Sequence, residues 1–338
     1  MKKHANLSIF IPHEGCTNGC IFCDQRIISG QQKAPLVEEV KEYCNRYLTD
    51  DFSDIDTKIA FFGGSFTAIE REYMISLLEV ASSFVKDGRA EGIRISTRPD
   101  AISYEILDIL KEYGVTAIEL GAQSMNDEVL KANKRGHTIE DTYQASEKIK
   151  EYKFSLGLQM MIGMYGEKDP KEEAIATAKH FIKIAPDTVR IYPTVVLADT
   201  ELEQLFSEGK YKVISVDKAA VLVANLFTMF ESRGIKVIRI GLHSDVGLAK
   251  SIIAGPFHPS FGEMVRSYIM REKLEEVLKD KEHGTYIVYV SPNDISSMVG
   301  LKKMNKYFFS NLGYPFRVKA NEELKRGEIY AYMDNAMF

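Results

Sequence analysis

The 338-residue chain lacks several features that would each point to a class of protein. No apolar stretch is long enough to span a bilayer, and no signal-type segment with a cleavage site stands at the start, so we expect a cytoplasmic protein. Positive charge is not in excess, because the formal net charge is -5, which opposes broad, nonspecific binding to nucleic acid. The charge balance therefore favours a small-molecule substrate over RNA.

Cysteine is scarce, yet three of the four cysteines lie within eight residues. The segment reads Cys16-Thr17-Asn18-Gly19-Cys20-Ile21-Phe22-Cys23. Such close spacing in a cytoplasmic chain favours metal binding over a framework of disulfides. Thiolates bind both iron–sulfur clusters and zinc, and three local ligands leave one coordination position open to a substrate-like ligand. The fourth cysteine, Cys44, lies among helical residues and is expected to be a packing residue.

A zinc site is the alternative interpretation of the three cysteines. His13 would be the fourth ligand, and the segment would then belong to a non-catalytic zinc-binding module.

Short apolar strands alternate with longer amphipathic helices over residues 7–240. Repeated strand–helix units predict a parallel sheet with right-handed crossovers. Six or seven units are too few for a closed eight-stranded barrel, so we predict an α/β fold, a partial (β/α)6 barrel of the TIM type. We expect strands at Leu7–Ile11, Lys58–Phe62, Gly92–Ser96, Thr116–Leu120, Ser155–Met161, Thr188–Tyr192 and Lys236–Ile240. We expect helices at about Leu36–Leu48, Arg71–Lys86, Ile102–Tyr113, Asp127–Lys134, Ile139–Tyr152, Pro170–Ile184 and Val216–Arg233.

The pattern changes after residue 240. A Gly- and Pro-containing loop precedes a long helical stretch, Phe261–Lys279, and a strand, Thr285–Val290. A second helix at about Asn293–Ser310 and a strand-rich tail follow. We predict a smaller α+β subdomain over residues 241–338 that covers a barrel of residues 1–240.

The cysteine segment resembles the signature of the radical-SAM superfamily, which is Cys-x3-Cys-x2-Cys with an aromatic residue before the last cysteine, here Phe22. The resemblance implies that Cys16, Cys20 and Cys23 are catalytic metal ligands of a [4Fe–4S] cluster. In that superfamily, S-adenosylmethionine binds the open iron and is cleaved to a 5′-deoxyadenosyl radical that abstracts hydrogen from the substrate. The resemblance also implies an electron donor, such as flavodoxin or ferredoxin, as a partner.

Glycines and polar residues follow the later strands, where the family binds its cofactor. Gly63, Gly64 and Ser65 resemble the motif for the methionine amino group. Gln123 and Arg135 resemble the pair that contacts the methionine carboxylate and ribose in the coproporphyrinogen-dehydrogenase-like branch, and a surface arginine at a helix end is the alternative for Arg135. The other cofactor contacts that we expect are Phe22, Ser96, Gln159 and Arg190.

The resemblance extends to the branch of the Elongator catalytic subunit, and the departures from it fall on the substrate side. No acetyltransferase segment follows, which argues against tRNA acetyl transfer. Tyr165 stands in a loop that differs from that of the family, where it would stack on a planar ligand or fill the loop. Asp199 would accept hydrogen bonds from the N–H groups of a guanine-like edge, or it would be a carboxylate at a helix N-terminus. The remaining candidates for substrate contact are His137, Tyr192 and His243, with a structural role as the alternative for each histidine.

Three possible functions follow from these observations. The first is a lyase reaction on a small planar base, because short members of the branch include queuine lyase, which cleaves queuine to 7-aminomethyl-7-deazaguanine. The second is direct RNA modification, for which Lys302, Lys303 and Lys306 beside Tyr307, Phe308 and Phe309, with Lys325 and Arg326, would form a basic-aromatic patch. A solvated helix face with a buried apolar side explains the same residues and is favoured. The third is the zinc-binding module.

Overall fold

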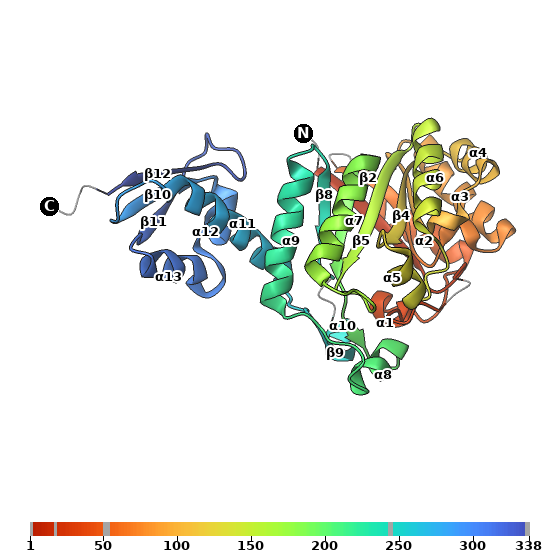
Figure 1. The fold of residues 1–338 in the computed structure, drawn as a ribbon. Helices are drawn as coiled ribbons and strands as arrows, with labels where there is room; N and C mark the ends of the chain where they lie inside the picture. Colours follow the sequence, from red (N-terminus) through yellow and green to blue (C-terminus); the bar gives the residue numbers. More distant parts are fainter. Residues whose placement is uncertain (1–2, 17–18, 50–54, 243–245, 335–338) are drawn as a thin grey trace. The chain divides into compact units, whose positions relative to one another are not determined.

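The computed structural model describes residues 3–16, 19–49, 55–242 and 246–334 (Figure 1). These residues form two compact units. Unit 1 takes the chain through Ile214 and again over Phe230–Phe257, and unit 2 takes Ser215–Met229 and the chain from His258 on. That residues 241–338 cover a barrel of residues 1–240 stays a prediction.

Unit 1 is built on a parallel sheet of seven strands in the order β1-β2-β3-β4-β5-β6-β8. Helices follow the strands and lie against the sheet (Figure 1). This open, curled sheet confirms the predicted α/β fold and partial barrel. The strands are β1 (Lys3–Ile11), β2 (Ile55–Gly63), β3 (Gly92–Thr97), β4 (Val115–Gln123), β5 (Ser155–Ile162), β6 (Thr188–Pro193) and β8 (Lys236–Ile240).

Strands β1, β2 and β4 extend well beyond the ranges that the sequence predicts. The β1–β2 ladder continues back to the pair Lys3 and Ile55, whereas the apolar run that marks β1 begins only at Leu7. Strand β4 runs on to Gln123 through an irregular register after Leu120. Hydrogen bonding to a neighbouring strand, rather than side-chain hydrophobicity, extends these strands, and local sequence patterns do not report that pairing.

Several helices of unit 1 begin at polar caps and bury one apolar side. Ser103, Asn126, Thr138 and Asp169 each accept a hydrogen bond from a backbone N–H of the first turn. The helices are α2 (Val37–Tyr47), α3 (Arg71–Lys86), α4 (Tyr104–Glu112), α5 (Asp127–Ala132), α6 (Ile139–Glu151) and α7 (Pro170–Ile184). Within the described residues, no helix is long and apolar enough to cross a membrane.

Several short elements of unit 1 escape prediction because they have too few residues to show a periodic pattern. Strands β7 (Val196–Leu197) and β9 (Ile252–Ala254) pair in antiparallel fashion. The short helices are α1 (Gln25–Ser29), α8 (Glu201–Ser207) and α10 (Val246–Ser251).

Unit 2 combines helices with a three-stranded sheet in the order β11-β10-β12. Its core joins Met270 and Leu274 of the long helix to Val288, Phe309 and Phe316. The elements are α9 (Val216–Glu231, most of it in this unit), α11 (Phe261–Leu278), β10 (Tyr286–Val290), α12 (Ile295–Val299), α13 (Met304–Asn311), β11 (Phe316–Ala320) and β12 (Ile329–Met333).

The single helix predicted at about Asn293–Ser310 is wrong. The chain breaks between α12 and α13, where Gly300, Lys302 and Lys303 have φ values of 78°, 50° and 64°. A Cβ on Gly300 would lie 2.7 Å from the Met304 Cγ, so the break requires glycine at this position. Each lysine in a left-handed conformation costs about 1–2 kcal/mol. The turn brings Phe309 into the core of unit 2, which offsets that cost by burying a full aromatic side chain.

Candidate functional site

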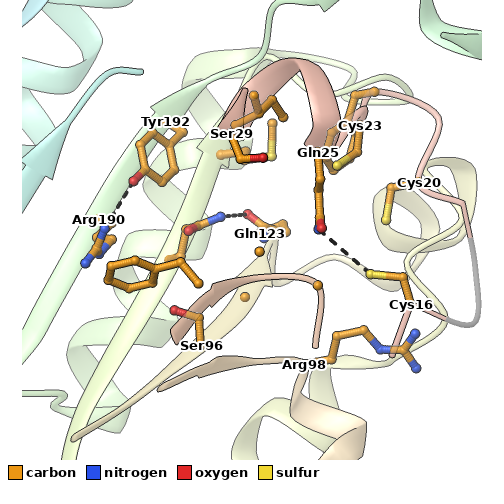
Figure 2. Close-up of a pocket in the computed structure, with 18 of the residues that line it drawn as sticks. Cys16, Cys20, Cys23, Gln25, Ser29, Ser96, Arg98, Gln123, Arg190 and Tyr192 are labelled. Carbon is orange, nitrogen blue, oxygen red and sulfur yellow. Dashed lines mark hydrogen bonds between the residues drawn. The ribbon is translucent and has the colours of Figure 1, made fainter. Parts of the chain in front are cut away.

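A cavity of about 470 Å³ opens in unit 1 and runs from the carboxyl ends of the strands into the curled sheet. This volume suits a small-molecule site, since such sites usually measure roughly 300–1,000 Å³. Figure 2 shows Cys16, Cys20 and Cys23 on one side of the cavity, with Arg190 and Tyr192 on the other. Most of the predicted contacts line it, namely Cys16, Cys20, Phe22, Cys23, Gly63, Gly64, Ser96, Gln123, Arg135, Gln159, Arg190 and Tyr192.

The cysteine loop is positioned by close backbone contact with the loop after β2. The Gly64 and Ser65 amides donate to the carbonyls of Ile11 and Glu14 at 2.8 and 2.9 Å. A Cβ on Gly64 would lie 1.8 Å from the Glu14 oxygen, and one on Gly15 would lie 2.4 Å from the Ser65 oxygen. Both glycines are therefore needed for the two loops to meet.

The donor set of the loop fits a metal cluster. Burial, followed by repulsion from the Cys20 thiolate, raises the pKa of Cys16 and of Cys23. Thiolates held this close together need a bound cation to stay deprotonated, which an iron–sulfur cluster provides. Phe22, which is buried among apolar side chains, anchors the loop between the second and third cysteines.

The zinc interpretation fits the geometry less well. The Nε2 atom of His13 accepts a hydrogen bond from the Gln25 amide at 3.0 Å, so its lone pair is already used. His13 instead holds the start of α1 against the end of β1.

Arg135 lies beside the cysteine loop rather than on the surface. Its Nη1 donates to the Cys20 Sγ at 3.1 Å, its Nη2 donates to the Gly121 carbonyl at 2.6 Å, and the residue is only 8% exposed. The alternative of a surface arginine at a helix end is therefore wrong. Contact with the methionine carboxylate stays a prediction, and the position next to the open side of the cysteine loop agrees with it.

Gln123 and Gln159 meet inside the cavity. The Gln159 Nε2 donates to the Gln123 Oε1 at 3.1 Å (Figure 2). Gln123 has a φ of 65° at the irregular end of β4, which turns its backbone away from the regular strand conformation. The pair presents amide donors and acceptors to whatever fills the cavity.

A buried ion cluster, which the sequence did not predict, lines the inner face of the sheet. Glu119 on β4 accepts from the Arg94 Nη1 at 2.5 Å and from the Arg190 Nη2 at 2.9 Å. The Arg190 Nε lies 2.6 Å from the second Glu119 oxygen, and its guanidinium carbon lies 5.0 Å from the centre of the Phe62 ring. Charged residues inside apolar strands are the signal that marks this cluster in the sequence, because such groups are buried only when paired.

Other lining residues were also missed. Gln25, whose Nε2 lies 3.8 Å from the Cys16 Sγ, follows the last cysteine of the loop by two positions (Figure 2). Arg98 follows β3 directly and Arg239 lies on β8, both at positions where other strands carry predicted site residues. Their place after or within strands is the same signal that marks Ser96, Gln159 and Arg190 in the sequence.

Among the described residues, four predicted site residues do not line the cavity, namely Ser65, Tyr165, Asp199 and His137. Ser65 is fully buried, where its hydroxyl meets that of Thr97 at 2.8 Å. Tyr165 packs beside Tyr211, with ring centres 6.3 Å apart, which agrees with the loop-filling alternative. Asp199 has a φ of 61°, and Thr200 rather than Asp199 caps α8.

Of the two histidines predicted to contact the substrate, the structure describes only His137. His137 is buried, and its ring Nε2 lies 3.1 Å from the Ala122 carbonyl oxygen, which agrees with the structural alternative. His243 lies outside the described residues. A substrate contact by either histidine stays a prediction.

His137 should make stability depend on pH. Burial, followed by repulsion from Arg135, lowers the pKa of His137 from 6.5 to about 4. The unfolded chain binds this proton below pH 6.5 whereas the folded chain does not, so stability is complete above pH 6.5 and falls as the pH drops toward 4. Urea unfolding across this range should show a loss of roughly 3 kcal/mol that is absent in His137→Gln. An equal loss in the variant would contradict the assignment, and His283→Gln, at an exposed position, is the matched control.

Comparison with known proteins places these features in a family. Residues 10–178 match the family model described as the Radical SAM superfamily, and residues 186–271 match the Radical_SAM C-terminal domain. An uncharacterized protein of Methanocaldococcus jannaschii is 29% identical over 233 residues, which cover 66% of this chain and 70% of that protein. The tRNA uridine(34) acetyltransferase of Methanocaldococcus infernus is 29% identical over 238 residues, which cover 64% of this chain and 43% of the enzyme.

A solved structure has a similar fold. The archaeal Methanocaldococcus infernus Elp3 with an N-terminal deletion superposes with a TM-score of 0.64 at 22% identity, covering 81% of this chain and 64% of that chain. This likeness concerns the fold alone. The chain spans less than half of the tRNA uridine(34) acetyltransferase that it matches.

Proposed function

Because the chain belongs to the radical SAM superfamily, whose members use a [4Fe–4S] cluster and S-adenosylmethionine, we propose that it is a lyase acting on a small, planar, base-like substrate, with queuine as the best candidate. Cys16, Cys20 and Cys23 would hold the cluster, and the fourth iron would be left for S-adenosylmethionine. When bound, the cluster and S-adenosylmethionine supply a 5′-deoxyadenosyl radical that takes a hydrogen atom from the substrate. Family membership argues against the non-catalytic zinc-binding module.

The residues of the chain bind and orient the two small molecules. Gly63 and Gly64 line the cavity beside the cysteine loop, on the side where the methionine part of S-adenosylmethionine would bind. Arg135 supplies a planar cation on the same side of the cavity. The curled sheet encloses the rest of the cavity and so limits the access of water to the reacting atoms.

The composition of the inner cavity is the observation that carries the substrate proposal. Phe10 and Phe62 lie with ring centres 6.1 Å apart and offer apolar surface to a flat ring. Tyr192, a predicted substrate contact that lines the cavity, offers a hydroxyl group to the edge of such a ring. A bicyclic deazaguanine needs both kinds of contact, apolar on its faces and polar at its edge.

Anaerobic turnover tests this function. Purified, cluster-loaded enzyme with dithionite, S-adenosylmethionine and free queuine should form 5′-deoxyadenosine together with 7-aminomethyl-7-deazaguanine, as measured by mass spectrometry. Tyr192→Phe should reduce product formation at least tenfold while leaving the iron content unchanged, because Tyr192 lies across the cavity from the cysteine loop (Figure 2). If 5′-deoxyadenosine forms only at its uncoupled background rate, the lyase proposal fails.

A second candidate function is radical modification of tRNA. Relatives named tRNA uridine(34) acetyltransferase and Elongator complex protein 3 favour it. In that case, 5′-deoxyadenosine formation would depend on added tRNA and not on free queuine. A flavodoxin or ferredoxin that replaces dithionite would identify the physiological electron donor for either substrate.

A further inference from the structure

The three-stranded sheet of unit 2 has one face that is rich in tyrosine and positive charge. Pairing of β10 with its two neighbours aligns the side chains of this face in two rows. One row is Arg317, Ile287 and Tyr332, and the other is Lys319, Tyr289 and Tyr330. Tyrosines thus occupy one side of the face, and cations occupy the other.

This face is exposed to solvent, whereas the opposite face is buried. Tyr330 and Tyr332 are 53% and 62% exposed, whereas large aromatic side chains are mostly buried in folded proteins. The alternate residues Tyr286, Val288 and Ala331 point the other way into the core of unit 2. The exposed tyrosines therefore contribute little to that core, and their exposure requires another explanation.

The arrangement combines aromatic surfaces with positive charge. The Tyr289 and Tyr332 rings meet edge to face, with centres 6.2 Å apart, and this contact helps to hold the Tyr332 ring in place. Within the described chain, Lys319 forms no ion pair, and Arg317 lies 3.9 Å from the Asp334 carboxylate with a side chain that is 64% exposed. Aromatic rings that stack on bases, beside cations that meet phosphates, are the two parts of a single-strand binding surface.

We propose that this face, defined by Tyr289, Arg317, Lys319, Tyr330 and Tyr332, binds single-stranded RNA. Tyr330 and Tyr332 are two residues apart on one strand, hence about 6.6 Å from each other, so each takes a separate base. Their hydroxyls have no hydrogen-bond partner among the described residues and are available to the ribose 2′-hydroxyl, which favours RNA over DNA.

The surface proposed here differs from the basic-aromatic patch considered in the sequence. Phe309 of that patch is buried in the core of unit 2, and Phe308 packs against it. Arg326 pairs with Asp294, with an Nε to oxygen distance of 3.3 Å. The favoured alternative, a solvated helix with a buried apolar side, therefore describes α13, and the RNA surface lies on the sheet instead.

Fluorescence anisotropy with a labelled 12-nucleotide single-stranded RNA of mixed sequence tests the proposal. The full-length, cluster-loaded protein should bind it, and Tyr330→Ala with Tyr332→Ala should raise Kd at least tenfold, because each stacked base contributes about 1–3 kcal/mol. The matched control is Tyr307→Ala, since Tyr307 is 63% exposed on α13 in the same unit but away from this face. Unchanged affinity in the double variant, or an equal loss in the control, would overturn the proposal.

Two further variants separate the parts of the surface. Arg317→Gln with Lys319→Gln should reduce the slope of log Kd against log salt by roughly 1.4, because each phosphate contact on a single strand contributes about 0.7. Tyr330→Phe with Tyr332→Phe should keep most of the affinity but lose the preference over DNA of the same sequence. If the parent protein binds this DNA as tightly as the RNA, the assignment to RNA is wrong.

The RNA surface and the proposed lyase activity can fail independently. Turnover of free queuine is measured without RNA, and the tyrosines of the sheet face are outside the residues that line the cavity. The double alanine variant should therefore keep that turnover while losing RNA binding. Loss of both would indicate that the substitutions disturb the protein more widely, and the surface would then not be a separate binding site.

Discussion

Cys20→Ala is expected to abolish cluster binding and, with it, the formation of 5′-deoxyadenosine. Cys20 lies between the other two cysteines of the loop, and all three line the cavity. Two remaining thiolates hold a [4Fe–4S] cluster too weakly to survive purification, because such clusters depend on their cysteine ligands. Iron and sulfide analysis of anaerobically reconstituted protein should fall from roughly four irons per chain to near background. The absorption of the cluster in the visible range should disappear in parallel.

Cys44→Ala is the matched control for this experiment. Cys44 is fully buried on α2 and does not line the cavity formed by the described residues. Its replacement leaves a small void that costs about 1 kcal/mol of stability, while the iron content should stay unchanged. Full iron content in Cys20→Ala, or equal loss in Cys44→Ala, would mean that the loop of three cysteines is not the cluster site.

The sequence predicts the cysteine loop well because its signal is local. Ligand spacing, the glycines and the anchoring Phe22 all lie within nine residues of Gly15. The seven strands of the parallel sheet are predicted for the same reason, since each apolar run is complete in itself. Their ends are less well predicted, because a strand such as β1 is extended by pairing with β2, which begins more than forty residues later.

The sequence does not predict the individual contacts between distant parts of the chain, even where, as for Arg135, the family resemblance places the residue at the site. The contact of Arg135 with Cys20 spans 115 positions and depends on the left-handed Lys134 that precedes Arg135. The break between α12 and α13 likewise depends on the packing of Phe309 against Phe316, which the sequence of the helices does not reveal. In both places tertiary contacts select a backbone conformation that local propensity disfavours.

The ion cluster on the inner face of the sheet is the clearest example of a contact that the sequence does not predict, because its three members come from β3, β4 and β6. In the sequence, each of these residues is only a single charged residue within an apolar strand. Only the strand order of the sheet shows that Glu119 lies between two arginines, and therefore that burial of all three is tolerable. This arrangement leaves one excess positive charge, which makes Glu119 more important to the cluster than either arginine.

Glu119→Ala is expected to destabilise the protein by about 3–5 kcal/mol, since it leaves Arg94 and Arg190 buried without their shared partner. The side chains are 5%, 14% and 16% exposed, respectively, so water offers little compensation. Urea unfolding of the cluster-loaded protein, followed by circular dichroism, measures the change. Adding Arg94→Met should recover part of the loss, because it removes one of the two unpaired charges.

The matched control is Glu105→Ala, which breaks the surface ion pair between Arg71 and Glu105. That pair has an N to O distance of 3.1 Å, but its side chains are 42% and 74% exposed, so its removal should change stability by less than about 0.5 kcal/mol. The contrast between the two glutamates isolates the effect of burial from that of ion pairing itself. A loss of stability below about 1 kcal/mol in Glu119→Ala would show that water in the cavity solvates the two arginines. The ion cluster of Arg94, Glu119 and Arg190 would then be a flexible part of the substrate site rather than a fixed part of the sheet.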